Sequence, residues 1–318
     1  MKKFVVDCLR TSFSAWLMLT KLTIPALLVV RVLMWFDLVG YFSIPFEPLM
    51  TFLGLPKELA LVWVTAMLAN NYTCLLVFLN ILPLIDPPTV AQATVLGCLI
   101  LVSHNLIVEG AVCRGAGVSP LRATLLRVLG AALYGFLIHK ACRLFGLGGD
   151  QAGLLIPFAS ADPVPPWDVW LLSNLKSLVF IFLVVTFLVV LMAVMRMIGL
   201  IKIVSRIFQP LMRLSGIGDK ATMITIIGMV MGLAIGGGLI IAESRSGKIP
   251  KNDIFSSVTL MNLCHSLFED TILMAFLGGT LWALLLGRII YSVLMTGLIV
   301  RLSKRPRGQS ILIGRKYA

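Results

Sequence analysis

Long apolar stretches separated by short polar or basic ones run through the whole chain, four in each half. Each is at least as long as the roughly 18–20 residues that a helix needs to cross a bilayer, and none alternates as a membrane β-strand does. The pattern therefore predicts an all-α integral membrane protein. The segments are residues 12–36, 57–82, 88–112, 122–145, 172–198, 219–243, 254–277 and 281–301.

The second half repeats the order of residues in the first. A Phe-x-Pro-Leu-Met-x3-Gly pattern occurs at 46–54 and again at 208–216. After a slip of one residue, the match pairs His104 with His265, Glu109 with Asp270, Gly117 with Gly278 and Arg127 with Arg288. Duplicated halves with polar residues near mid-bilayer are typical of secondary transporters, whose substrate sites form where the halves meet.

Composition predicts a membrane location, and the distribution of charge predicts the orientation of the chain in the membrane. The chain is 59% hydrophobic and 13% charged, with a mean hydropathy of +1.00, whereas soluble domains are about 45–50% apolar and 25% charged. The net charge of +13 does not indicate a nucleic-acid partner, because the basic residues gather beside helix ends, at 2–10, 196–220 and 301–316. By the positive-inside rule both termini are cytoplasmic. We therefore expect a multi-pass protein in the cytoplasmic (inner) membrane of a bacterium.

The linker between the halves, residues 147–170, contains aspartates and no lysine or arginine, which predicts an external position. Each half must then cross the membrane an odd number of times, although it has four apolar segments. The second segment of each half is interrupted, by Asn70-Asn71 in one and by Gly236-Gly237-Gly238 in the other. Irregular backbone at membrane depth must be buried in protein or face a polar cavity. These segments therefore read as re-entrant hairpins.

The predicted fold is thus two inverted-topology repeats, each with three spanning helices and one re-entrant helical hairpin. The alternative, in which all eight segments span, places the acidic linker inside and the basic loop at 114–122 outside. The predicted divisions are residues 1–146 for the first repeat, 147–170 for the external linker, 171–302 for the second repeat and 303–318 for a basic cytoplasmic tail.

Two related motifs give a family resemblance. Val-Ala-Gln-Ala-Thr at 90–94 leads to Ser-His-Asn-Leu-Ile-Val-Glu-Gly at 103–110, and Cys-His-Ser-Leu-Phe-Glu-Asp-Thr at 264–271 is its counterpart. With the Pro-Leu-Met segments and hairpins, residues 10–302 resemble the Gate, or nucleoside recognition, family. That family includes the membrane part of ferrous-iron transporter B and the spore maturation proteins A and B, and is related in fold to concentrative nucleoside transporters. The resemblance implies an inverted-repeat transport core, but not its substrate.

Ionisable residues within the apolar segments are the candidate chemistry. Each costs at least about 2.5–3.5 kcal/mol at mid-membrane, so His104 and Glu109 must face partners or a cavity. They lie about 140° apart on an ideal helix, so both reach one site only if the helix is unwound between them. His265 and Glu269 are four apart and share a helical face, with Asp270 turned further round.

Two sets of candidate residues follow. The predicted substrate-binding residues are Asn70, Asn71, His104, Asn105, Glu109, Gly236, Gly237, Gly238, His265, Glu269 and Asp270. If the substrate or coupling ion is a metal, its candidate ligands are His104, Glu109, His265, Glu269 and Asp270. Structural readings stay open: histidine–carboxylate pairs that join the halves, asparagines that cap helices, glycines that form a turn, and Arg127 and Arg288 as partners of buried carboxylates.

The favoured function is a secondary transporter, or permease, for a small polar or ionic solute. A nucleoside-like compound and a metal cation are rival substrates, with a proton or cation as the coupling ion and no resident cofactor. No Walker loop, nucleophile elbow or Rossmann glycine pattern occurs, so we do not expect an enzyme. The alternative is a non-transporting membrane partner or assembly protein of the spore-maturation type. A homo-oligomer is compatible with either reading.

Overall fold

The computed structural model describes residues 2–154, 162 and 164–303. In this part of the chain every regular element is a helix, which confirms the all-α prediction. Residues 155–161 and 163 of the linker, and the tail from residue 304 onward, lie outside the described residues.

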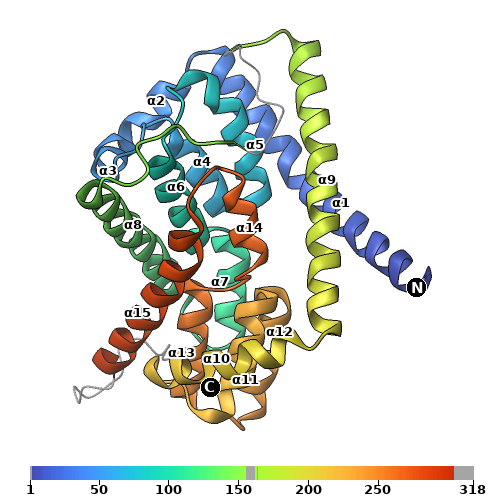
Figure 1. Ribbon diagram of the computed structural model, residues 1–318, viewed down its shortest axis with the longest axis vertical. Helices are drawn as coiled ribbons and strands as arrows, with labels where there is room; N and C mark the ends of the chain where they lie inside the picture. The colour runs from blue at the N-terminus through green and yellow to red at the C-terminus, as the bar shows by residue number, and fades with distance from the viewer. Residues whose placement is uncertain (1, 155–161, 163, 304–318) are drawn as a thin grey trace.

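The first half runs from α1 to α8 (Figure 1). Its elements are α1 (Lys2–Trp35), α2 (Val39–Ser43), η1 (Ile44–Phe46), α3 (Glu47–Phe52), α4 (Leu59–Leu68), α5 (Asn71–Ile81), η2 (Leu82–Leu84), α6 (Val90–Ser103), α7 (Leu106–Gly115) and α8 (Pro120–Phe145). The second half has α9 (Trp167–Met197), α10 (Leu200–Leu214), α11 (Asp219–Met231), α12 (Leu233–Ser246), α13 (Lys251–Leu263), α14 (Glu269–Ala275), η3 (Trp282–Gly287) and α15 (Arg288–Ser303).

The exterior of the long helices is apolar, as a bilayer requires. On α8, Leu125, Leu129 and Leu133 recur at intervals of four and are 51%, 67% and 43% exposed, so they form one outward stripe. On α15, Ile290 and Leu294 form a similar stripe, with 60% and 65% exposure.

Five helical stretches of the described chain are long and apolar enough to cross a membrane. They are residues 4–35, 90–115, 120–145, 167–197 and 282–303. The stretch at 90–115 combines α6 and α7, which are separated by a break. The bent pair α10 and α11 passes the same test together, with an angle of 119° between its parts. The chain therefore has the make-up of a multi-pass membrane protein.

The long helices α1 and α9 lie side by side along one edge of the molecule (Figure 1). Trp16 on α1 donates a hydrogen bond from its indole nitrogen to the carbonyl of Leu178 on α9, over 2.9 Å. The remaining helices pack on the other side of this pair, and α6 packs extensively against α8.

The interruption predicted at Asn70-Asn71 is confirmed. Helix α4 ends at Leu68 and α5 begins at Asn71, while the side chain of Asn70 accepts hydrogen bonds from the backbone nitrogens of Tyr72 and Thr73 at 3.0 and 2.9 Å. An asparagine in this position satisfies amides that the first turn of a helix leaves free. The capping role weighed for Asn70 is therefore present.

The interruption predicted at Gly236-Gly237-Gly238 is wrong, because these glycines lie inside α12. The break is at Gly232, which adopts φ +85° between α11 and α12. A Cβ on Gly232 would lie 2.5 Å from Ser266 Oγ, so both conformation and space require glycine there. Gly236 instead allows close helix packing, since a Cβ on it would lie 2.2 Å from the Cα of Gly228 on α11.

Several local features recur in both halves at matching positions. The left-handed residues Asn105 (φ 53°) and Ser266 (φ 46°) correspond. Gly54 and Gly216 have φ 71° and 74°, and Gly117 and Gly278 have φ 80° and 83°. Matching helices in the two halves are therefore followed by turns of the same backbone conformation.

Candidate functional site

The helix carrying His104 is broken directly after that residue. Helix α6 ends at Ser103, His104 is extended at ψ 161°, and Asn105 takes a left-handed conformation before α7 starts at Leu106. Asparagine tolerates this conformation better than most residues. The Asn105 backbone nitrogen donates to the carbonyl of Ala66 on α4, over 2.8 Å. The predicted unwinding between His104 and Glu109 is therefore found, and the neighbouring hairpin holds it.

The second half contains an equivalent break around His265. Helix α13 ends at Leu263 and α14 starts at Glu269, with Ser266 left-handed between them. The Leu267 backbone nitrogen donates to the carbonyl of Met229 on α11, over 2.8 Å. Each broken helix is thus tied to the first arm of the hairpin in its own half.

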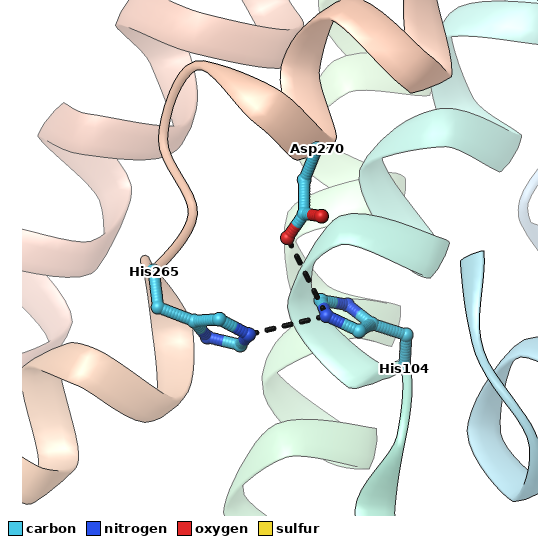
Figure 2. Close-up of side chains that lie close together, drawn as sticks. All are labelled: His104, His265 and Asp270. Carbon is cyan, nitrogen blue, oxygen red and sulfur yellow. Dashed lines mark hydrogen bonds and ion pairs between the residues drawn. The ribbon is translucent and has the colours of Figure 1, made fainter. Parts of the chain in front are cut away.

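The two breaks bring the two histidines into contact. Figure 2 shows their rings pointing toward each other from opposite sides, and His104 Nε2 lies 3.1 Å from His265 Nε2. Both residues are almost fully buried, at 5% and 3% exposure. The cluster is therefore shared between the halves.

The other ring nitrogens define the tautomers. His104 Nδ1 lies 3.0 Å from the carbonyl oxygen of Ile100, and His265 Nδ1 lies 2.9 Å from that of Met261. A carbonyl oxygen only accepts, so each Nδ1 must carry the hydrogen, and in a neutral ring Nε2 then bears a lone pair. Two lone pairs facing each other at hydrogen-bond distance repel. A proton or a metal ion between the two rings would remove this repulsion.

Two buried carboxylates flank the paired rings. Asp270 Oδ2 lies 3.4 Å from His104 Nε2, and Glu109 Oε1 lies 3.3 Å from His265 Nε2 and 3.6 Å from His104 Nε2. Glu109 also forms an ion pair with Arg127, whose Nε donates to the carbonyl of Val102. The predicted role of Arg127 as partner of a buried carboxylate is confirmed.

Arg288 occupies the matching position in the second half but has different partners. Its Nη2 donates to the carbonyl of His265 over 2.7 Å, and its Nε to that of Leu263 over 3.3 Å. Asp270 forms no ion pair with either arginine within 4 Å and its Oδ2 has no hydrogen-bond donor among the described residues. The two carboxylates are therefore in unequal surroundings, with Glu109 compensated by Arg127.

The expected shared face of His265 and Glu269 is wrong, because His265 lies in the break and not on a helix. Glu269 is the first residue of α14, and its Oε1 accepts a hydrogen bond of 2.9 Å from the hydroxyl of Tyr72. Asp270, not Glu269, therefore reaches the histidines. Tyr72 is the contact that sequence reasoning missed, and its place directly after Asn70-Asn71 was the available signal.

The predicted site residues thus divide into groups. His104, His265, Asp270 and Glu109 form the cluster, and Asn105 shapes one of its two breaks. Asn71 is buried, with no hydrogen-bond donor for its Oδ1 in the described chain. Gly236 and Gly237 are buried and Gly238 is exposed, all three within α12.

A cavity of about 1010 Å³ lies beside the first break. Its lining includes Leu68 at the end of α4, Leu106 and Gly110 of α7, and the arginines Arg114 and Arg245. Leu106 and Gly110 are close neighbours in sequence of His104 and Glu109, although neither of these two residues lines the cavity.

These features define a multi-pass α-helical membrane protein with a buried histidine–carboxylate cluster between two broken helices. The chain is 26% identical, over 98% of its own length and 98% of the relative's, to a protein of Bacillus subtilis (strain 168) described as "Uncharacterized membrane protein YvoD". No family model and no solved structure matches the chain. The relative agrees with the membrane assignment.

Proposed function

We propose that this protein is a secondary transporter, and not an enzyme, that moves a small polar or ionic solute with proton or cation coupling. One observation carries the proposal: two helices, one from each half, break at the same buried point and present His104, His265 and two carboxylates to each other. Burying such groups in a membrane is costly, and their usual role there is in a substrate or ion pathway. Broken helices around a shared site are a recurring design of transporters.

The proposal includes the inverted-repeat topology expected from the sequence. In the first repeat α1, α6–α7 and α8 would span, and α4–α5 would form the re-entrant hairpin. In the second repeat α9, α13–α14 and η3–α15 would span, with α11–α12 as the hairpin. Support comes from the long apolar helices, from the left-handed residues that recur at both breaks, and from the matching hairpin contacts. The basic clusters would then face the cytoplasm.

The cavity gives the proposed pathway its direction. Arg114 and Arg245 in its lining favour a cytoplasmic position for the cavity, and Leu106 and Gly110 in the same lining are close in sequence to His104 and Glu109. A solute entering there would approach the cluster from one side only. The structure would therefore correspond to a cytoplasm-facing state of an alternating-access cycle.

Transport can be tested in proteoliposomes that contain a pH-sensitive dye. A panel of nucleosides and divalent cations is added outside, and solute-dependent proton movement and solute uptake are both recorded. We expect flux with at least one class, lost in the His104→Gln/His265→Gln double variant. The third histidine of the chain, His139, provides the control: His139→Gln should transport normally. A wild-type protein that moves none of these solutes but co-purifies with a membrane partner would favour the assembly role instead.

A further inference from the structure

We propose that His104, His265 and Asp270 form a binding site for a divalent first-row transition-metal ion. Their ligand atoms, the two Nε2 and Oδ2, all lie within 4.8 Å of one another in the described structure. Binding would not depend on transport, whereas the role of the metal as cargo or coupling ion rests on the proposed function. The two can therefore fail separately.

The spacing of the ligand atoms fits one shared ion. With metal–ligand bonds of about 2.0–2.1 Å and angles between octahedral and tetrahedral values, neighbouring ligand atoms lie about 2.9–3.4 Å apart. The Nε2–Nε2 distance is 3.1 Å, and the distance from His104 Nε2 to Asp270 Oδ2 is 3.4 Å. The third distance, from His265 Nε2 to Asp270 Oδ2, is longer but within 4.8 Å. An ion at this point would also remove the repulsion between the two facing lone pairs.

The surroundings hold the rings as metal-binding histidines are usually held. Each Nδ1 donates to a carbonyl one turn earlier, of Ile100 or Met261, which fixes both the tautomer and the ring plane. His104 directly follows the last residue of α6, and His265 lies two residues past Leu263, the last residue of α13, so each ring folds back on the last turn of its helix. Both Nε2 atoms are thereby aimed at the same point.

The unequal carboxylates identify the third ligand. Glu109 is already paired with Arg127, whereas Asp270, buried at 6% exposure, has no arginine or lysine within 4 Å in the described chain. A buried carboxylate beside an imidazole nitrogen is strongly destabilised unless a cation pairs with it. Two imidazoles and one carboxylate favour zinc, iron, cobalt or nickel over magnesium and calcium, which prefer oxygen ligands alone.

The test uses the full chain in detergent, purified through a tag without histidine and stripped with a chelator. Co²⁺ is titrated and followed by calorimetry and by its visible d–d absorption, with Mg²⁺ as the comparison ion. We expect one Co²⁺ per chain, displaced by Zn²⁺ and not by Mg²⁺. His104→Gln, His265→Gln and Asp270→Asn should each weaken binding by about tenfold or more. His139→Gln should bind as the wild type does.

A measurement on the unmodified protein guards against variants that do not fold. X-ray absorption of the Co²⁺ complex should show a shell of nitrogen and oxygen ligands with the outer scattering of two imidazoles. Absence of stoichiometric binding, or equal binding by the three ligand variants, would overturn the site and leave a proton between the rings. Metal binding without flux would keep the site and overturn the transporter. Flux without metal binding would overturn the metal site and keep the transporter.

Discussion

The ion pair between Arg127 and Glu109 allows a quantitative test of the cluster. Arg127 is 1% exposed and Glu109 is 2% exposed, so neither charge can be solvated if its partner is removed. Arg127→Gln would leave the Glu109 carboxylate buried beside His104 and His265 with no compensating guanidinium. Breaking a buried pair in this way costs about 3–5 kcal/mol.

The double variant Glu109→Gln/Arg127→Gln removes both charges. It should be more stable than the summed losses of the two single variants predict. Residues in one ion-pair network couple by about 0.5–3 kcal/mol, and we expect the upper part of that range for a fully buried pair. The matched control is Arg122→Gln on the same helix, because Arg122 is exposed and should change stability by less than about 0.5 kcal/mol.

Melting in detergent at a fixed scan rate, followed by tryptophan fluorescence, provides the assay. With about 2 °C of Tm per kcal/mol for a chain of this size, Arg127→Gln should lower Tm by about 6–10 °C, and Arg122→Gln by no more than about 1 °C. The double variant should recover several degrees relative to Arg127→Gln. If Arg127→Gln melts like the wild type, or if the effects of the single variants simply add, the pair does not compensate a buried charge.

The remaining predictions concern packing and topology. Gly236→Ala would place a Cβ 2.2 Å from the Cα of Gly228 and should lower Tm by about 2–6 °C, whereas Gly238→Ala meets nothing within 4 Å and should not. An impermeant maleimide on intact cells should label Asp168→Cys and not Arg301→Cys, with little background because all six native cysteines are buried. The opposite labelling pattern would invert the proposed orientation.

The helices and two of the breaks were predictable because their causes are local. Long apolar segments give spanning helices by length alone, and paired asparagines within one of them favour a capped break, as at Asn70. The break after His104 followed from geometry, since His104 and Glu109 cannot reach one point from a straight helix. In each case a few neighbouring residues determine the local structure.

The position of the break in α11–α12 was not predictable, because glycine has two different uses in this segment. Gly232 supplies a positive φ beside Ser266, a residue far along the chain, and Gly236 supplies room for Gly228 on the facing helix. Both requirements are tertiary. A run of three glycines in a sequence suggests a turn. In this protein the contacts across the hairpin determine which glycine forms the break.

The choice between Glu269 and Asp270 depended on where a helix restarts. A continuous helix through residues 265–270 would place His265 and Glu269 on one face. The chain instead restarts at Glu269, which sends that side chain to Tyr72 and Asp270 to the histidines. An error in the register of one break thus exchanges the roles of two adjacent carboxylates.

The two similar halves build an asymmetric site, because their carboxylates have different partners. Glu109 and Asp270 occupy matching positions, but glutamate is longer by one methylene, and Glu109 contacts both Arg127 and His265. Asp270 contacts His104 and forms no ion pair with Arg288, whose bonds go to backbone carbonyls. One carboxylate is therefore paired with an arginine within the protein, and the other is the one that the proposed metal ion would pair with.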